Sequence, residues 1–233
     1  MLKKSTIEKV ISEDMAAIWS ILTMEEKHQI TDNFMIHNFK KGQLIYAEKD
    51  EPQFLWTLLK GKVKLFKDGI GGRPQILRLY RPIQYFGYRA YFAHESYVSS
   101  AAAFEPSTLG AIPLDLVKRL INENRQLAWF FITELSKNLG GSDSRIVSLT
   151  QKHIRGRLAE SLVALLDNYG YEEDHETLKI YLAREDLANL SNMTTSNAIR
   201  TLSAFAQERI ITVDGRRIKI INEQQLRNIS KFG

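Results

Sequence analysis

The sequence predicts an α+β protein whose N-terminal half is rich in β-strands and whose C-terminal half is helical. Short apolar runs separated by glycines fill the chain up to residue 112, and apolar residues recur every three or four positions after Pro113. An Asp214-Gly215 pair also stands between two alternating apolar runs. Short strands with glycine-containing turns are typical of sandwiches and barrels, whereas a three-to-four spacing is typical of helices.

Composition limits the class of protein. The chain has 233 residues, of which 44% are hydrophobic and 25% charged, and its formal net charge is +5. This is the composition of an ordinary globular protein, and the modest positive charge favours a polyanionic partner without proving one. The chain has no cysteine, which excludes disulfides, cysteine-ligated zinc and cysteine-ligated iron–sulfur clusters.

No targeting or membrane segment is expected. The longest apolar runs, residues 54–59 and 127–132, are too short to span a bilayer. Residues 1–22 resemble a targeting peptide in position, but Glu8 and Glu13 argue against a transit peptide. We interpret this segment as an amphipathic helix of the mature protein, and we expect a cytoplasmic protein that does not bind membranes.

The β-rich part contains predicted strands at residues 41–46, 54–59, 61–66 and 75–80. Residues 68–74 are rich in glycine and end in a proline, so we interpret them as the tip of a hairpin. The change to a helical pattern falls near residues 112–114.

A long helix is predicted over residues 124–152. Its apolar positions alternate in steps of three and four, as in a coiled-coil contact, and residues 127–131 add a second apolar face. Two apolar faces need two partners, which we interpret as the β-rich part and a second copy of the chain; burial within a single domain is the alternative. The predicted dimer contact consists of Ile132, Leu135, Leu139, Ser142, Ile146 and Leu149.

Two glycines, Gly140 and Gly141, lie in the middle of this predicted helix. Each costs about 1 kcal/mol relative to alanine in a helix interior. They are therefore either a tolerated weak point, or a hinge or a place of close helix–helix approach, and the sequence leaves these alternatives open.

The remaining segment is predicted to hold a helix over residues 154–168, a short strand over 178–180, two short helices within 184–205 and a hairpin over 210–221. Asp-Gly between alternating apolar residues is a strong hairpin signal. Two short helices joined by a polar turn are the layout of a helix-turn-helix, whose second helix enters the DNA major groove. The following hairpin makes this a winged helix-turn-helix.

The order of these elements and four motifs resemble the cyclic-AMP receptor protein / fumarate-nitrate regulator (Crp/Fnr) family of bacterial transcriptional regulators. The motifs are KKGQLI at residues 40–45, LKGKVKLF at 59–66, RGRLA at 155–159 and the family's R-x-D-L-A pattern within 184–205. The turn residue that is usually glycine is Asn192 here, which can also adopt left-handed geometry. The usual capping hydroxyl before Arg184 is replaced by Ala183.

The resemblance implies a cyclic-nucleotide-binding-like β-roll (double-stranded β-helix) with N-terminal helices in residues 1–122, a dimerisation helix in 123–152 and a winged helix-turn-helix in 153–233. It implies a sequence-specific transcriptional regulator that binds double-stranded DNA as a homodimer on an inverted-repeat operator. The sequence contains no nucleophile elbow, phosphate loop, HExxH motif or convergent acid–base set. We therefore expect no enzyme activity, no catalytic residues, no metal and no cofactor.

The second helix of the helix-turn-helix is expected to begin after Thr194, which is positioned as its N-cap. Arg200 could then grip guanine, and Asn197, on the same side, could pair with adenine. The expected DNA-binding residues are Arg184, Thr194, Thr195, Ser196, Asn197, Arg200, Arg216 and Arg217, with Lys219 as a further candidate. For the basic residues, surface charge with no role in DNA binding is the alternative. An apolar side is expected to seat the helix on its domain: Ala198, Ile199, Leu202 and Phe205.

The ligand residues of the family's cyclic-AMP binders are altered in this chain. Those proteins hold the ribose with a Gly-Glu pair and the phosphate with an Arg-Ser pair, whereas the corresponding stretch here is FGYRAYF at residues 86–92. Tyr88 replaces the glutamate, Arg89 is displaced, and the later arginine position falls near Tyr97. We expect that cyclic nucleotide is not the ligand. The candidate pocket residues for another effector are Tyr88, Arg89, Tyr97 and Ser99; the alternative is that the tyrosines fill the roll's interior.

Other partners remain open in the sequence. His37, His94 and His153 have no ligand spacing, so a haem is not expected. RNA polymerase and an unidentified small-molecule effector are open as partners besides DNA and a second copy of the chain. The alternative function is a β-roll that binds a small molecule and has weak or lost DNA binding.

Overall fold

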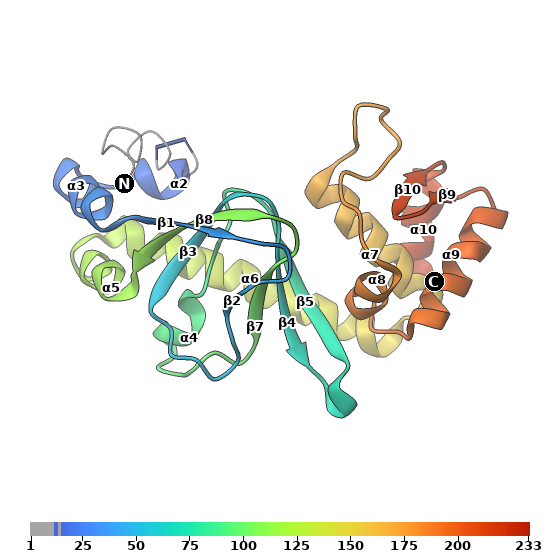
Figure 1. Ribbon diagram of the computed structural model, residues 1–233, viewed down its shortest axis with the longest axis horizontal. Coiled ribbons are helices and arrows are strands. Elements are labelled where there is room, and N and C mark those ends of the chain that lie inside the picture. Colours follow the sequence, from blue (N-terminus) through green and yellow to red (C-terminus); the bar gives the residue numbers. More distant parts are fainter. Residues whose placement is uncertain (1–11, 14) are drawn as a thin grey trace. The chain divides into compact units, whose positions relative to one another are not determined.

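The computed structural model describes residues 12–13 and 15–233, and the chain divides into two compact units (Figure 1). Unit 1 comprises the residues up to Lys67 together with Leu77–Gly140. Unit 2 comprises Asp68–Ile76 together with Gly141–Gly233. The boundary in the long helix therefore falls between its two glycines.

Two short helices precede the sheets of unit 1: α2 (Ala16–Trp19) and α3 (Met24–Asn33). A capping box starts α3, because the backbone N–H of Glu26 donates to Oγ1 of Thr23 (3.3 Å) and that of Thr23 donates to the Glu26 carboxylate (2.6 Å). The chain turns after Trp19, so the expected single helix over residues 1–22 is wrong in its described part. Residues 1–11 and 14 lie outside the described part of the chain.

Unit 1 is built on two four-stranded sheets with the strand orders β1-β8-β3-β6 and β2-β7-β4-β5, of which only residues 68–76 belong to unit 2. The strands are β1 (Met35–Phe39), β2 (Leu44–Tyr46), β3 (Phe54–Lys60), β4 (Val63–Asp68), β5 (Pro74–Tyr80), β6 (Tyr85–Phe86), β7 (Ser100–Ala103) and β8 (Ser107–Pro113). Every strand expected before residue 112 is present, and a single 3₁₀ turn at residues 70–72 forms the expected hairpin tip. The sequence does not predict β1, β6, β7 or β8. In β7 the reason is its composition, because it reads Ser-Ala-Ala-Ala and alanine is depleted in strands.

The interior of unit 1 consists of two apolar clusters. One lies within the sheets and includes Trp56, Leu58, Phe86 and Leu109. The other joins strands β3 and β8 to the surrounding helices and includes Phe34, Leu114, Leu127 and Phe131. Leu127, Phe130 and Phe131 of the expected second apolar face therefore pack in the interior of their own unit, whereas Trp129 between them is 68% exposed.

Two helices follow β8 directly: α5 (Leu114–Glu123) and α6 (Arg125–Gln151). Asn124 starts α6, because its Oδ1 accepts the backbone N–H groups of Gln126 and Leu127, both at 3.0 Å. These are donors that the first turn of a helix leaves without an intrahelical partner. Gly140 and Gly141 do not interrupt α6, and a Cβ added at either would meet no atom within 4 Å.

Unit 2 contains the expected helix, helix-turn-helix and hairpin. Its elements after α6 are α7 (Ile154–Tyr169), α8 (Arg184–Leu190), α9 (Thr195–Gln207), β9 (Ile211–Asp214), β10 (Arg217–Ile220) and α10 (Glu223–Phe232). The strand expected at residues 178–180 is wrong: Leu178 makes only an isolated bridge to Tyr171, and the preceding Thr177 makes another to Lys219. Sheet, long helix and helix-turn-helix together confirm the α+β fold class.

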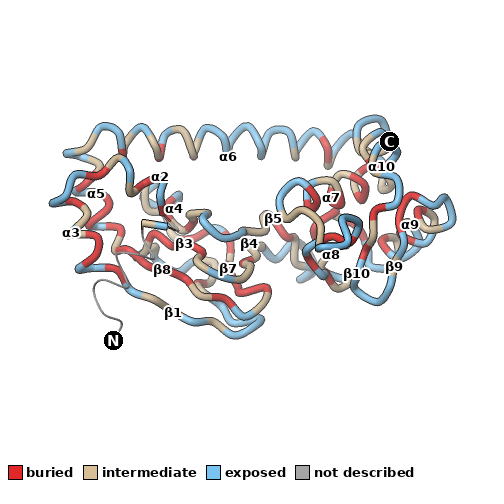
Figure 2. Tube along the Cα trace, turned by 90° about the horizontal axis from the view of Figure 1, so that it is seen from above, coloured by how far each residue is buried: buried red, intermediate tan, exposed pale blue. Residues whose placement is uncertain are grey.

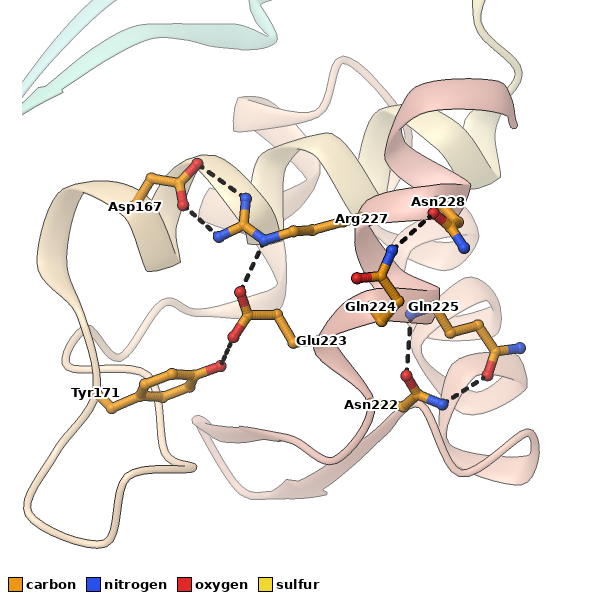
Figure 3. A network of polar contacts seen from close by, with 8 residues as sticks. All are labelled: Asp167, Tyr171, Asn222, Glu223, Gln224, Gln225, Arg227 and Asn228. Carbon is orange, nitrogen blue, oxygen red and sulfur yellow. Dashed lines mark hydrogen bonds and ion pairs between the residues drawn. The ribbon is translucent and has the colours of Figure 1, made fainter.

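The sequence does not predict α10, which packs on α7. Its buried Leu226 provides the apolar contact, and Arg227 provides the polar one by pairing with Asp167 of α7 (2.6 Å) and with Glu223 (2.7 Å). The hydroxyl of Tyr171 donates to the same Glu223 carboxylate at 2.8 Å (Figure 3). The hydrogen bonds from Arg227 and Tyr171 hold the pKa of Glu223 below its ordinary value. The network ties the segment after the hairpin to the start of the loop after α7.

Candidate nucleic-acid interface

The turn between α8 and α9 positions the candidate interface. Asn192 has a φ of 50°, so it adopts the left-handed geometry that the family's turn glycine usually supplies. The next residue, Met193, donates its backbone N–H to the carbonyl of Ala188 (3.0 Å) and is buried. The hydroxyl of Ser191 donates to Oγ of Ser161 on α7 (2.8 Å), which attaches the end of α8 to the domain. No side-chain bond caps α8 at Ala183, as the sequence predicts.

The expected N-cap of α9 is present: Oγ1 of Thr194 accepts the backbone N–H of Asn197 at 3.2 Å. Ala198, Leu202 and Phe205 are buried at steps of four and three, which seats one side of α9 on α7 and α8. The prediction that Ile199 also lies on this buried side is wrong, because 46% of Ile199 is exposed. Position 199 lies about 100° around the helix from position 198, at the edge of the buried side.

The solvent side of α9 carries the small polar residues and Arg200. Thr195, Ser196 and Arg200 are exposed, and Asn197 is half-buried. Nη2 of Arg200 donates to Oδ1 of Asn197 at 2.6 Å. Arg200 forms no ion pair with any carboxylate in the part of the chain that the structure describes. Its positive charge is therefore presented on the exposed side of the second helix.

The hairpin after α9 carries the other candidate arginines. Gly215, with a φ of 54°, forms the turn between β9 and β10, and Arg216 beside it is exposed. Nη2 of Arg184, at the start of α8, donates to the carbonyl oxygen of Gly215 at 2.6 Å. The guanidinium of Arg217 lies 5.7 Å from the ring centroid of Tyr181. Arg184 thus holds the hairpin turn against the helix-turn-helix.

Other basic side chains of unit 2 are neutralised by carboxylates. Lys219 pairs with Asp174 (3.1 Å) and Glu176 (3.5 Å), so it is a weaker candidate for a phosphate contact than Arg200. Hydrogen bonds from Thr177 are the main cause that holds the pKa of Asp174 far below its ordinary value, so this carboxylate stays charged. Arg155 pairs with Glu208 in the same way.

The predicted dimer contact on α6 is only partly exposed (Figure 2). Ile132, Leu139 and Ile146 are 50%, 64% and 60% exposed, and they recur every seven residues. Leu135 and Leu149 are half-buried, and Leu135 packs against the cluster of unit 1. Ser142 is exposed. The two apolar faces expected of this helix are therefore both present, and one of them faces solvent in the single chain.

The candidate pocket residues lie in different surroundings. Tyr88 and Tyr97 are buried in two different apolar clusters, and burial raises the pKa of both hydroxyls. Tyr97 stacks on Tyr46 with ring centroids 3.7 Å apart. Arg89 is exposed and pairs with Glu95 at 3.2 Å. Ser99 is buried. The structure therefore places the two tyrosines as packed interior side chains.

One polar network at the same place is not predicted by the sequence. The Tyr88 hydroxyl accepts a hydrogen bond from Nδ2 of Asn138 on α6 (3.4 Å), and Arg78 of β5 donates to both Oδ1 and the backbone carbonyl of Asn138. No motif joins residues 78, 88 and 138, so only the folded chain reveals this contact.

Among the described residues no cluster of histidine, cysteine or acidic side chains could hold a metal ion, and no described helix is long and apolar enough to cross a membrane.

Replacing Arg184 with alanine is expected to loosen the hairpin turn. The lost hydrogen bond to the Gly215 carbonyl is worth about 1 kcal/mol, which corresponds to about fivefold faster amide exchange at residues 214–217. Hydrogen–deuterium exchange measures this directly. Arg216→Ala is the matched control, because the exposed Arg216 makes no contact with the turn carbonyl. Unchanged exchange in Arg184→Ala would show that the turn does not depend on this bond.

Comparisons with known proteins agree with the architecture. The cyclic nucleotide-binding domain family model matches residues 36–124, and the Crp-like helix-turn-helix domain family model matches residues 156–229. The CRP-like cAMP-activated global transcriptional regulator of Mycobacterium tuberculosis is 22% identical over 190 residues, which cover 81% of this chain and 85% of that protein. The fumarate and nitrate reduction regulatory protein of Vibrio cholerae is 24% identical over 192 residues, which cover 82% and 76%.

A solved structure shares the fold as well. FixK2 from Bradyrhizobium japonicum superposes with a TM-score of 0.77 at 20% identity, covering 84% of this chain and 96% of that chain. The two matching family domains follow each other in the order of the sheets and the helix-turn-helix described above. The chain therefore belongs to the Crp/Fnr family of transcriptional regulators, with a cyclic nucleotide-binding domain and a Crp-like helix-turn-helix domain.

Proposed function

We propose that this protein is a sequence-specific regulator that binds double-stranded DNA as a homodimer on an inverted-repeat operator in the cytoplasm. In this proposal residues 1–122 form the effector domain, 123–152 the dimerisation helix and 153–233 the DNA-binding domain. The observation that carries it is the exposed Arg200 on the solvent side of α9, which has no carboxylate partner among the described residues. The opposite side of α9 is buried against α7 and α8 through Ala198, Leu202 and Phe205.

The proposed DNA contacts divide into two kinds. Thr195, Ser196 and Arg200 lie on the solvent side of α9, where side chains reach base edges in the major groove. Arg216 and Arg217 lie on the hairpin, and arginines there suit phosphate oxygens, which position a protein on DNA without reading its sequence. Arg184 contributes by holding the hairpin turn, and Thr194 by capping α9.

The proposed dimer uses the solvent face of α6. Ile132, Leu139 and Ile146 recur at the spacing of one coiled-coil position, and each leaves at least half of its surface exposed in the single chain. A second copy of the same helix covers this stripe by the same residues, since a two-fold contact is self-complementary. The half-buried Leu135 and Leu149 and the exposed Ser142 flank the stripe.

The proposed effector domain does not bind cyclic nucleotide. Tyr88 stands where a carboxylate would hold the ribose, and its hydroxyl is engaged by Asn138. Arg89 is paired with Glu95 rather than presented to a phosphate. Another small molecule and RNA polymerase are proposed as further partners. The alternative, a small-molecule-binding roll with weak or lost DNA binding, leaves the exposed Arg200 with little or no role.

Random-site selection with the intact protein is expected to return an inverted repeat with half-site centres about 34 Å apart, one turn of B-DNA. Replacing Arg200 with alanine should cost about 1–3 kcal/mol per half-site and relax the preference at one base pair. Arg119→Ala removes an exposed arginine from α5 and should change neither quantity. Unpaired half-sites, or an unchanged preference in Arg200→Ala, would contradict the proposal.

Replacing Leu139 with aspartate is expected to convert the dimer into monomers, because it places a charge at the centre of the apolar stripe. An uncompensated charge in an apolar contact costs several kcal/mol. Analytical ultracentrifugation measures the mass of the particle. Leu44→Asp, at an exposed position of strand β2, makes the same chemical change away from α6 and should leave the mass unchanged. A dimer that survives Leu139→Asp disproves the assigned contact.

Calorimetric titration with cyclic AMP and cyclic GMP is expected to give no binding heat at micromolar concentrations, because the carboxylate and the free arginine needed for the ribose and phosphate are missing. The Mycobacterium tuberculosis relative, named as cAMP-activated, is the positive control in the same buffer. Micromolar binding by this chain would overturn this part of the proposal.

A further inference from the structure

Arg200 and Asn197 are joined by a short hydrogen bond on the solvent side of α9. Nη2 of Arg200 donates to Oδ1 of Asn197 at 2.6 Å, slightly below the usual range of about 2.7–3.2 Å for N–H···O bonds. Residues three apart on a helix are neighbours, so the bond needs no distortion of the backbone. Asn197 is itself held in place, because its backbone N–H donates to the Thr194 cap at 3.2 Å.

This bond leaves Asn197 poorly suited to read adenine. An asparagine that recognises adenine must accept a hydrogen bond from the N6 amino group with Oδ1 and donate from Nδ2 to N7. Oδ1 is the only acceptor of the amide, and one of its two lone pairs already accepts from a guanidinium. An adenine amino group at the same oxygen would bring its hydrogens beside a positive charge, which repels them.

Arg200, in contrast, keeps what it needs to read guanine. A guanidinium has five N–H donors, and four of them form two pairs of parallel N–H bonds. One pair joins Nη2 and Nη1, and the other joins Nη2 and Nε, so each hydrogen of Nη2 belongs to a different pair. Whichever hydrogen of Nη2 bonds to Asn197, the other pair stays complete for O6 and N7 of guanine. The bond also restricts the rotamers of a long side chain before it meets DNA, so less freedom is lost on binding.

We infer that Asn197 is a positioning residue, which orients the Arg200 guanidinium toward one guanine and reads no base of its own. This rests on the proposed function, and it replaces the expectation that Asn197 pairs with adenine. The operator half-site then has one base pair that depends on both residues together, instead of two base pairs that depend on one residue each.

The test is a double-mutant cycle on the selected operator and on its single-base-pair variants. Operator affinity is measured by fluorescence anisotropy for the intact dimer and for Asn197→Ala, Arg200→Ala and the double variant. Asn197→Ala is expected to weaken binding about tenfold per half-site and to relax the same base pair as Arg200→Ala. The double variant should bind little more weakly than Arg200→Ala alone, because the two changes remove one interaction.

Asn197→Asp is the conservative variant, because it keeps an acceptor for Arg200 and adds a charge near the phosphates. It should keep the guanine preference while overall affinity falls, a split that loss of structure would not produce. Asn228→Ala is the matched control: it removes the exposed bond from Nε2 of Gln224 to Oδ1 of Asn228 on α10 (3.2 Å, Figure 3) and should change neither affinity nor preference. Circular dichroism confirms that each variant is folded.

The outcomes separate this inference from the function on which it rests. If the unaltered protein selects no DNA sequence, the proposed function fails. If it selects an operator but Asn197→Ala relaxes a second, A·T base pair, and the losses of the two single variants add, Asn197 reads adenine and only the positioning role is overturned.

Discussion

The burial of one side of α9 is the constraint on which the candidate interface depends. Ala198, Leu202 and Phe205 are buried against α7 and α8, and the Arg155 guanidinium lies 4.7 Å from the Phe205 ring centroid. Burying one leucine or phenylalanine side chain contributes about 1.5–3 kcal/mol, more than an exposed polar contact does. Because the helical period is fixed, seating these three residues leaves Thr195, Ser196 and Arg200 in solvent. The apolar seat therefore decides what the helix can recognise.

The same physical rule acts on α6 with a different result. Leu127 and Phe131 on one side of the helix complete the apolar interior of unit 1. Ile132, Leu139 and Ile146 are then left exposed on the other side, although each would gain free energy from burial. A long helix with one satisfied and one unsatisfied apolar face is the physical reason to expect a second copy of the chain.

Charge pairing in unit 2 distinguishes basic residues that a count of arginines and lysines treats alike. Arg155, Lys219 and Arg227 are paired with carboxylates and serve the packing of the domain. Arg184 instead donates a hydrogen bond to a backbone carbonyl, and Arg200 donates one to a neutral side-chain amide. A hydrogen bond to a neutral group leaves the positive charge of the arginine available for a phosphate or a guanine, whereas an ion pair with a carboxylate does not. The tertiary structure therefore reduces the number of basic residues that are candidates for DNA contacts.

The sequence by itself determined the elements whose signals are local: the strands punctuated by glycines, the long helix, the Thr194 cap, the left-handed Asn192 and the Asp-Gly hairpin. Each of these elements depends on residues only a few positions apart in the chain. Each of the four motifs that indicate the family is also a short local pattern. Only the tertiary structure decided that Ile199 faces solvent, that Tyr88 meets Asn138 and that Lys219 is neutralised by Asp174. It also decided that Arg184 supports the hairpin turn. These depend on residues that are distant in the chain or on the exact edge of a helical face, and no local pattern records which distant partner a side chain will meet.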